Sequence, residues 1–411
     1  MNLTASTNEG GASLAAVRLH NTFMELGHHS YLIAHRGLGG RKGSHIQVLR
    51  KSKFLSKVIQ LIDSIPTRFY RRRTKGAWGN AFCGNLSLRD IERFQFDIVV
   101  LYWIDSGFMS LSLLKALTQM QRIRVVIRLS DQWLFTGGCH YSGACDRFKM
   151  SCGRCPILKS HIGFDLSFYN LSRKSKVNFS KVEIACPSQW IAELAQSSRV
   201  LKGSRIKVIK TGVDLSIFNP VGRGRFGLEG RSVKLSFGAV NYKDDKRKGF
   251  EKIKALIEQL ASIKELNFTV DVFGDPNASF KIISDHIQIT HHGKIDVDEK
   301  LAEIYRNSDI FVCPSLEENL PNTALESIAC GTPVVCFDVG GMGEVVINGV
   351  TGQVCDINAE DGLLEGILKI ISHNDKYLKY RTNCSEFATK ELDRFHIASK
   401  LLEPYNNVLI H

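Results

Sequence analysis

Short apolar segments typical of strands alternate with helical patterns along this chain, and the alternation occurs twice. Strands and helices that take turns predict a parallel sheet with helices on both faces. In the first half the predicted strands are Tyr31–Ala34, Asp97–Ile104, Arg124–Leu129 and Val182–Ala185, and the predicted helices are Leu14–Leu26, Leu111–Met120 and Gln189–Gln196. In the second half the predicted strands are Val233–Phe237, Phe268–Phe273, Ile310–Cys313 and Val334–Phe337, and the predicted helices are Gly249–Leu260, Asp298–Arg306, Asn322–Ala329 and Asp361–Ser372.

The pattern is interrupted between the halves, where TGVDLSIFNP leads into the glycine- and arginine-rich VGRGRFGLEG. A length of 411 residues also favours two domains. We therefore expect an α/β fold with two doubly wound, Rossmann-like domains at residues 1–210 and 231–391, a linker at 211–230 and a helical segment at 392–411. Ligands should bind in a cleft between the domains, at the carboxyl ends of the strands. Only Met1–Ser6 precedes the first glycine turn, so the first strand should be short, and an upstream start codon is an open alternative.

Positive charge is concentrated in the first half. Residues 1–210 hold 32 Lys and Arg against 12 Asp and Glu, whereas the remainder holds 22 against 29. Such a field favours anionic lipid, lipid-linked phosphate or nucleic acid. No nucleic-acid-binding motif accompanies it, so we favour an anionic membrane surface. No apolar run is long enough to span a membrane and no secretory signal is evident, so we expect a cytoplasmic protein, peripheral on the inner membrane.

One basic segment, Arg50–Trp78, also carries apolar residues near helical spacing. Cations flank these positions, among them Lys57, Arg68 and Arg71–Arg73. Helices of this kind can lie in a membrane interface. Packing of the same helix on a protein core remains the alternative.

The cysteines form two groups. Seven of the 11 are scattered, and Cys186, Cys313 and Cys336 lie in apolar strand patterns that predict buried thiols. The other four fall in a loop at residues 136–156 with the spacing C-x5-C-x6-C-x2-C, and they are Cys139, Cys145, Cys152 and Cys155. Four thiolates can close a tetrahedral zinc site, so structural zinc is one prediction. Reduced thiols and redox pairing remain open, although a cytosolic chain argues against disulfides.

The segment Phe311–Phe337 places two carboxylates around a helix start. Pro321 suits the first helical turn, so Glu318 should lie in the preceding loop and Glu326 on the helix. The backbone N–H groups of Leu320, Asn322 and Thr323 fall between them. Carboxylates accept hydrogen bonds from sugar hydroxyls, and a helix N-terminus suits phosphate, so the pattern is typical of a nucleotide-sugar site. A buried helix with merely solvated glutamates is the alternative.

This segment resembles the donor-site motif of retaining GT-B glycosyltransferases of family GT4. The matching residues are Ser315, Glu318, Pro321, Glu326, Gly331, Pro333 and Val334. The resemblance implies transfer of a sugar from a nucleotide-diphosphate donor with retention at the anomeric carbon and without a catalytic metal. It assigns the donor sugar's hydroxyls to Glu318 and the ribose hydroxyls to Glu326. It also implies that part of residues 392–411 returns to the first domain.

A basic run precedes the helix predicted at Gly249. In the same family an arginine and then a lysine-glycine pair grip the diphosphate, and Lys248 with Gly249 matches that pair. Arg247 is our candidate for the arginine, while Asn241 and Lys243 lie closer to the usual spacing. Cations are needed because negative charge grows on the leaving diphosphate. A solvated run of charge is the alternative.

Several glycines occupy positions where the backbone could approach a ligand. Gly10 and Gly11 open the first helix and are expected to touch donor or acceptor. By resemblance, the loops at Gly274 and Gly293 border the nucleotide base, and Gly340–Gly341 with Glu344 closes the pocket floor. Ordinary tight turns are the alternative for each of these glycines.

The loop RLSDQWLFTGGCHY resembles a GT4 subgroup of bacterial surface-polysaccharide enzymes. Many members carry a histidine before the aspartate, near the reacting carbon, where this chain has Ser130 and then Asp131. Asp131, our candidate catalytic residue in this domain, or His140 could replace that histidine, whereas Ser130 or Asp131 could instead cap a helix.

The resemblance therefore predicts a retaining hexosyltransferase. A UDP- or GDP-sugar would be the donor, and a lipid-linked saccharide at the membrane would be the acceptor. Two alternatives remain: a sugar-nucleotide epimerase or phosphorylase, and a non-catalytic relative that binds nucleotide sugar or scaffolds a synthase complex.

Overall fold

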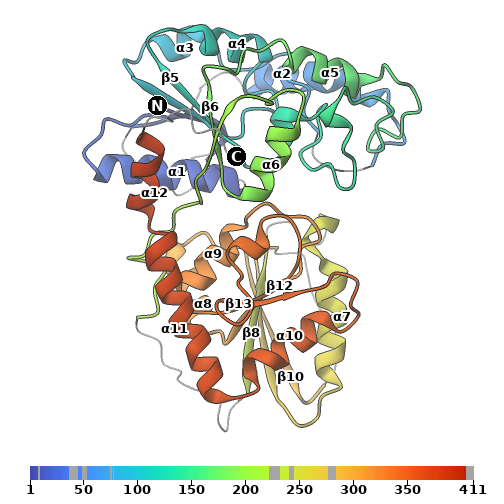
Figure 1. The fold of residues 1–411 in the computed structure, drawn as a ribbon, viewed down its shortest axis with the longest axis vertical. Coiled ribbons are helices and arrows are strands. Elements are labelled where there is room, and N and C mark those ends of the chain that lie inside the picture. Colours follow the sequence, from blue (N-terminus) through green and yellow to red (C-terminus); the bar gives the residue numbers. More distant parts are fainter. Residues whose placement is uncertain are drawn as a thin grey trace. The chain divides into compact units, whose positions relative to one another are not determined.

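The computed structural model describes residues 1–7, 10–36, 45–48, 53–74, 76, 78–221, 232–239, 245–275 and 284–403. The chain divides into two compact units (Figure 1). Unit 1 comprises Met1–Ile209 and the chain from Ala398 onward, and unit 2 comprises Lys210–Ile397. Residues 222–230 of the predicted linker, together with Asn241 and Lys243, lie outside the described residues.

Unit 1 contains a seven-stranded, fully parallel sheet in its described residues, with the order β3-β2-β1-β4-β5-β6-β7. Its strands are β1 (Asn2–Ser6), β2 (Leu32–Arg36), β3 (Ile46–Val48), β4 (Ile98–Leu101), β5 (Arg124–Arg128), β6 (Glu183–Cys186) and β7 (Arg205–Val208). Its helices are α1 (Gly10–Glu25), α2 (Lys53–Arg68), α3 (Leu88–Glu92), α4 (Leu111–Gln119), α5 (Leu166–Lys174) and α6 (Gln189–Ser197). The chain enters the sheet at the interior strand β1, runs out to the edge strand β3 and then returns to β4 on the other side of β1, as in doubly wound folds.

The central strands of unit 1 are apolar along their length because both sheet faces are covered. Val99 and Leu101 of β4 join one core cluster, in which Leu113 and Leu117 of α4 also lie. Local capping fixes where α4 begins, since the Ser110 hydroxyl accepts the N–H of Leu113 at 3.2 Å.

Unit 2 contains a six-stranded parallel sheet in its described residues, with the order β10-β9-β8-β11-β12-β13. Its strands are β8 (Val233–Gly238), β9 (Phe268–Phe273), β10 (Ile287–Gly293), β11 (Ile310–Cys313), β12 (Val334–Phe337) and β13 (Gly352–Cys355). Its helices are α7 (Phe250–Ala261), α8 (Asp298–Asn307), α9 (Asn322–Ala329), α10 (Gly362–Ile371) and α11 (Asn374–Glu391), and α12 (Arg394–Leu402) follows them into unit 1.

Strand β11 shows how unit 2 is layered. Ile310 and Val312 pack into one core with residues of α7 and α10, whereas Phe311 and Cys313 pack into another core with residues of α8 and α9. Successive side chains of a strand point to opposite faces, so the sheet is buried on both sides. The doubly wound α/β fold predicted from the sequence is confirmed in each unit.

The end of α12 is held in unit 1 by one arginine. The guanidinium of Arg124 donates to the carbonyl oxygens of Leu401, Leu402 and Glu403 at 3.0, 2.5 and 2.7 Å, and it pairs with Glu183 at 2.6 Å. A cation at the last carbonyls of a helix satisfies acceptors that have no partner within the helix. These contacts explain why the chain from Ala398 belongs to unit 1 rather than unit 2.

Most predicted elements are observed with small shifts at their ends, whereas no range was predicted for β3, β7, β10, β13, α3, α5 and α11. The strand predicted at Asp97–Ile104 ends at Leu101, because the chain turns just beyond it at Ser106 and Gly107, which have φ values of 57° and 75°. None of the helices in the described residues is long and apolar enough to cross a membrane.

Candidate active site

The carboxyl edge of the unit 2 sheet gathers glycine loops from neighbouring strands. Gly274, which follows β9, donates its N–H to the carbonyl of Gly293 at the end of β10 over 2.7 Å. Both glycines have positive φ, 103° and 63°. A Cβ at Gly274 would overlap the carbonyl of Ala239, which follows β8. Three strand ends therefore meet here, and Gly274 permits the close approach.

The lysine-glycine turn lies against the loop after β11. Gly249 has φ 71°, and a Cβ there would overlap the carbonyl oxygen of Pro314. The N–H of Leu316 donates to the carbonyl of Arg247 at 2.6 Å, which joins the same two segments. Glycine is therefore required at position 249 both for its backbone conformation and for space.

This arrangement brings Lys248 and Glu318 into a direct ion pair. Burial alone would raise the pKa of the Glu318 carboxyl, but the Lys248 ammonium outweighs it and lowers that pKa below its usual value. Burial would likewise lower the pKa of Lys248, but Glu318 outweighs it and raises that pKa. Both groups are thus charged at neutral pH at the carboxyl edge of the sheet.

The loop after β12 covers the same carboxylate from another side. Gly340 has φ 58°, and a Cβ there would overlap the carbonyl oxygen of Glu318. The next N–H, that of Gly341, donates to the carbonyl of Asn319 at 2.9 Å, and a short turn ending at Glu344 follows. The backbone around Glu318 is therefore fixed by two loops.

Helix α9 begins directly after this loop. Pro321 is its N-cap with φ −74°, one residue earlier than the first-turn position predicted for it. Asn322 and Thr323 form the partly exposed first turn, and Leu320 before them is buried. The predicted order, with Glu318 in the loop and a helix start after it, is observed.

Glu326 lies on α9 as predicted, and its side chain is only 1% exposed. The hydroxyl of Tyr305, on α8, donates to its Oε2 at 3.3 Å. In this structure Glu326 therefore contacts the neighbouring helix, and its contact with ribose stays a prediction.

Arg247 precedes Lys248 in the same turn. Its guanidinium pairs with Asp245 at 2.5 Å, and about a third of its side chain is exposed. It lowers the pKa of Glu318 to a lesser extent than Lys248 does. A second cation thus lies beside the ion pair, as a diphosphate site requires.

Two glycines of unit 1 are also candidate site residues. Gly10 and Gly11 are exposed and open α1, after β1. Gly10 has φ 81°, but a Cβ there would meet no atom within 4 Å, so only its backbone conformation demands glycine.

Asp131 follows β5 and belongs to a buried cluster of charges. The Asp131 carboxylate accepts a hydrogen bond from the N–H of Trp133 at 2.8 Å and contacts Nδ1 of His140 at 2.7 Å. The other ring nitrogen of His140, Nε2, contacts the carboxylate of Asp105 at 2.9 Å. Burial would lower the pKa of His140, but the two carboxylates raise it to about 10. The predicted catalytic carboxylate thus holds a local turn and a buried imidazolium.

Sequence reasoning missed two members of this region, Asp105 and Lys174. Lys174 is fully buried and donates to the carbonyls of Trp133 and Thr136, and its ammonium lies 3.9 Å from the centroid of the Trp133 ring. Burial lowers the pKa of Lys174 to about 7. A polar residue just after a parallel strand was the available signal for Asp105, whereas Lys174 carries no comparable signal.

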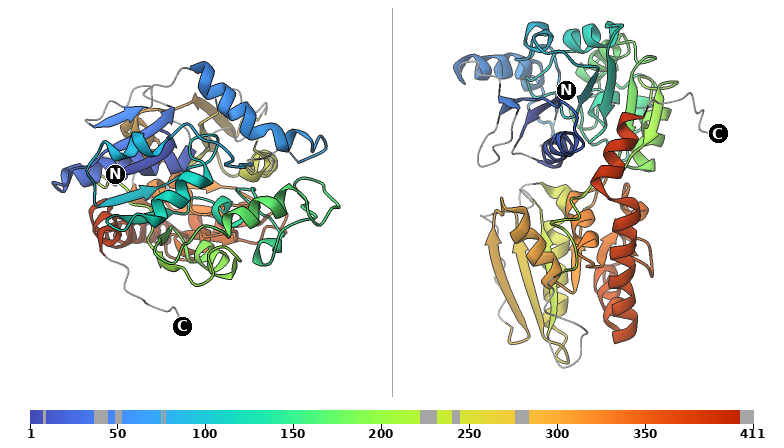
Figure 2. Two further views of the ribbon diagram at one scale, coloured as in Figure 1. Left: turned by 90° about the horizontal axis from the view of Figure 1, so that it is seen from above. Right: turned by 90° about the vertical axis from the view of Figure 1, so that its left-hand side faces the viewer.

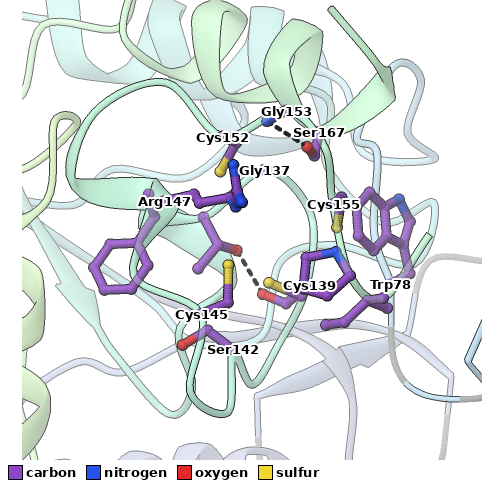
Figure 3. A pocket seen from close by; sticks show the side chains of 14 residues that line it. Trp78, Gly137, Cys139, Ser142, Cys145, Arg147, Cys152, Gly153, Cys155 and Ser167 are labelled. Atoms are coloured by element: carbon purple, nitrogen blue, oxygen red, sulfur yellow. Dashed lines mark hydrogen bonds between the residues drawn. The ribbon is translucent and has the colours of Figure 1, made fainter. Parts of the chain in front are cut away.

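The four clustered cysteines line one small pocket of about 20 Å³ (Figure 3). Burial raises the pKa of the Cys139 and Cys152 thiols to about 12. All 11 cysteines of the chain are free thiols. As placed, no three His, Cys, Asp or Glu side chains of the described residues form a group that could hold a metal ion. The four cysteines line one pocket, but as placed they do not form a ligand set for a metal ion. The zinc site stays a prediction.

Comparisons with known proteins identify relatives of the chain. A family model described as glycosyl transferases group 1 matches residues 243–391. An uncharacterized glycosyltransferase of Methanocaldococcus jannaschii is 30% identical over 274 residues, which cover 64% of this chain and 70% of that protein. The alpha-maltose-1-phosphate synthase of Mycolicibacterium smegmatis is 27% identical over 256 residues, which cover 57% of this chain and 65% of that protein. The putative colanic acid biosynthesis glycosyl transferase WcaC of Escherichia coli is 21% identical over 351 residues (82% of each).

The chain spans 65% of the length of the synthase and 48% of a further curated relative. Among solved structures, sucrose-phosphate synthase from Thermosynechococcus elongatus superposes with a TM-score of 0.66 at 17% identity, covering 97% of this chain and 96% of that one. HepE of Anabaena in complex with UDP-glucose gives a TM-score of 0.57 at 13% identity, with 97% of each chain covered. These similarities show the GT-B fold. The glycosyltransferase of Methanocaldococcus jannaschii, covered over 70% of its length at 30% identity, and the matching family model together show that the chain belongs to the group 1 glycosyl transferases.

Proposed function

We propose that this protein transfers a hexose from a UDP- or GDP-sugar to a lipid-linked saccharide, with retention at the anomeric carbon, in surface-polysaccharide synthesis. The observation that carries the proposal is the Lys248–Glu318 ion pair at the carboxyl edge of the unit 2 sheet. In this proposal Lys248 binds the diphosphate, and the Glu318 carboxylate beside it accepts sugar hydroxyls. Both are preorganised by glycine loops that tolerate no side chain.

The chemistry follows from this arrangement. As the glycosidic bond breaks, negative charge grows on the leaving diphosphate, and Lys248 with Arg247 stabilises it. Glu318 holds the donor sugar's hydroxyls, and Glu326 the ribose hydroxyls. The departing phosphate takes the acceptor's proton on the same face, so no enzymic nucleophile and no catalytic metal is required. In this proposal Gly274 and Gly293 border the base, Gly10 and Gly11 lie near a substrate phosphate, and Asp131 positions the acceptor side.

Relatives support the substrate classes. HepE was solved with UDP-glucose, which supports a nucleotide-sugar donor here. WcaC is named for colanic acid biosynthesis, and a further structural neighbour, WaaG, is described as acting in lipopolysaccharide biosynthesis. Both names concern cell-surface saccharides, which supports a saccharide acceptor.

Helix α2 supports an acceptor presented at a membrane. Amphipathic helices of globular proteins ordinarily bury their apolar stripe. Here the buried positions are the polar Ser56, Asp63 and Thr67, whereas Phe54 is 78% exposed and the apolar residues Leu55, Leu61, Ile62 and Ile65 are 44–49% exposed. Figure 2 shows α2 on the outside of unit 1. We define these five apolar residues as the α2 apolar face, and we propose that it enters the anionic surface of the cytoplasmic membrane.

The test is a donor screen. Purified protein is incubated with a panel of UDP- and GDP-sugars, with and without a membrane extract that contains lipid-linked saccharides, and nucleotide release is measured. We expect release from at least one donor and a marked increase with the extract, with the product's anomeric configuration matching the donor's. An inverted product would refute the retaining mechanism.

The second candidate is a non-catalytic protein that binds nucleotide sugar. It is favoured by Ser130, since many members of the similar subgroup carry histidine there. Measurable nucleotide binding without release from any donor would favour this candidate over transfer.

A further inference from the structure

A polar cavity of about 400 Å³ lies beside α2 in unit 1. One side of α2 contributes Asp63, Thr67 and Arg68 to its lining, and the chain beyond α2 contributes Arg73 and Asn80. Its volume falls within the range of small-molecule sites. The cavity therefore adjoins a helix whose apolar face is turned outward.

The deep part of the cavity is a fixed set of hydrogen-bonding groups. The Asp63 carboxylate is 6% exposed and accepts the N–H groups of Phe82 and Cys83 at 2.7 and 3.3 Å. The Asn80 amide donates to the carbonyl of Asp63 at 2.7 Å and to the hydroxyl of Thr67 at 2.8 Å. Because these side chains are held from several directions, they are preorganised for a polar ligand. A carboxylate that accepts about four hydrogen bonds retains capacity for a sugar hydroxyl.

The outer part of the cavity is cationic. Arg68 and Arg73 line it and are exposed. Within the described part of the chain, neither guanidinium has a carboxylate partner. Guanidinium groups bind phosphate through two parallel hydrogen bonds, so two of them suit a phosphate or diphosphate. Arg68 closes α2 three residues after Ile65 of the α2 apolar face.

We propose that this cavity binds the phosphate and the adjoining sugar of the lipid-linked acceptor, with the lipid chain leaving along the α2 apolar face. The Asp63 carboxylate in the deep part would take a sugar hydroxyl, and Arg68 with Arg73 would take the phosphate. The Asn80 amide already makes four hydrogen bonds within the protein, so it holds the wall of the cavity and does not contact the sugar. This assignment rests on the proposed function, because it places the acceptor of the same reaction. It joins three features at and just beyond one helix: an outward apolar face, two arginines without a carboxylate partner among the described residues, and a preorganised polar cavity.

The test compares two double variants. Arg68→Gln with Arg73→Gln removes the cavity cations, whereas Arg71→Gln with Arg72→Gln removes the same charge from exposed neighbours that do not line the cavity. The probe is a 15-carbon prenyl diphosphate in non-ionic detergent, titrated by calorimetry. The corresponding prenyl alcohol and inorganic pyrophosphate serve as partial probes, which separate a lipid head group from free phosphate.

We expect the cavity variant to bind prenyl diphosphate about 100-fold more weakly than the native chain, since two charge-assisted contacts are lost. The control variant should change the affinity less than threefold. Both partial probes should bind the native chain more weakly than prenyl diphosphate. Equal losses in the two double variants, or equal affinity for pyrophosphate and prenyl diphosphate, would overturn the assignment. Matching thermal unfolding of both variants excludes misfolding as the cause.

A third variant, Asp63→Asn, tests the deep part of the cavity and keeps its volume. With a saccharide-bearing acceptor it should raise KM about tenfold and leave the affinity for prenyl diphosphate unchanged. An unchanged KM would contradict the contact with the sugar.

Failure of this inference is distinguishable from failure of the proposed function. If prenyl diphosphate binds as expected but no nucleotide sugar releases nucleotide, the proposed transfer is refuted and the cavity remains supported as a site for a lipid diphosphate. If transfer occurs with the same acceptor KM in the native chain and in the cavity variant, the cavity assignment falls and the transfer stands.

Discussion

At the scale of single residues, the site is defined by Lys248 and Glu318, two charges that burial would separately disfavour. Transferring either one from water is costly, and their pairing offsets that cost only in part. A salt bridge of this kind contributes little net stability. Its position at the carboxyl edge of a doubly wound sheet gives it a functional reason to be present.

Lys248→Met should therefore reduce both stability and activity. It leaves the Glu318 carboxylate buried without a partner, which costs about 3–5 kcal/mol, and it removes a cation from the leaving group, which costs about 100-fold or more in kcat. Adding Glu318→Gln should recover most of the stability and none of the activity. Urea unfolding and nucleotide release measure the two effects, and recovery of activity in the double variant would refute the assigned role.

The pair also has a defined pH dependence. The contribution of the charged Glu318 carboxylate to the free energy of unfolding is present above its unfolded pKa of 4.5. This contribution is lost as the pH falls through the lowered pKa of the folded state. The Lys248 contribution is present below 10.5 and is lost as the pH rises through the raised folded pKa. Both groups therefore remain charged, and their mutual attraction is retained, across the neutral range.

His140 and Lys174 should give opposite pH dependences of stability in unit 1. The folded pKa of His140 is raised from 6.5 to about 10, so its contribution is full below pH 6.5 and falls as the pH rises towards 10. The folded pKa of Lys174 is lowered from 10.5 to about 7, so its penalty disappears as the pH rises over the same interval. We expect urea midpoints between pH 7 and 9.5 to rise with pH in His140→Gln and to fall with pH in Lys174→Met. Parallel profiles in the two variants would contradict these protonation states.

At the scale of elements, the glycine loops hold the site. Gly340→Ala should lower stability by several kcal/mol and weaken donor binding, because the new Cβ overlaps the Glu318 carbonyl. Gly349 is the matched control, since it also has positive φ, 77°, but a Cβ there meets no atom within 4 Å. Gly349→Ala should cost about 1–2 kcal/mol, the strain of the left-handed conformation alone. Similar losses in the two variants, measured by urea unfolding, would show that the packing against Glu318 is unimportant.

Helix α2 allows a separate test of membrane binding. Ile62→Ser with Ile65→Ser should weaken sedimentation with vesicles of mixed anionic and neutral phospholipid at least tenfold, since two partly exposed apolar side chains no longer enter the bilayer. Stability should remain unchanged. Val297→Ser with Ile347→Ser, which removes exposed apolar groups from unit 2, is the control and should bind as the native chain does. Unchanged binding of the α2 variant would refute the membrane assignment.

At the scale of the whole molecule, sequence patterns predicted the fold class and most of unit 2. The strand Ile310–Cys313 and the helix Asn322–Ala329 match the structure residue for residue, because both are apolar, short and bounded by turn residues. Edge strands carried weaker signals. In β7 cations alternate with apolar residues, and in β13 a glycine and a glutamine interrupt the pattern, so neither was predicted.

The candidate site also has one part that the sequence predicted and another part that it did not. The contact between Lys248 and Glu318 could be anticipated because two loops at the same sheet edge each carry a recognisable motif. The cluster around His140 could not, because Asp105, Asp131 and His140 come from three segments that only the tertiary structure brings together. The outward apolar face of α2 was equally hidden, since periodicity shows that a helix is amphipathic and leaves open which side is buried.

The affinity of the protein for nucleoside diphosphates tests whether Lys248 and Glu318 form a donor site. UDP, GDP and the corresponding nucleosides are titrated by calorimetry into the native chain, Lys248→Met and the exposed control Lys246→Met. If Lys248 and Glu318 form the donor site, Lys248→Met should weaken the preferred nucleoside diphosphate at least tenfold and leave the nucleoside unaffected, while Lys246→Met should change neither. Native affinity of Lys248→Met for the diphosphate would show that Lys248 does not bind the donor.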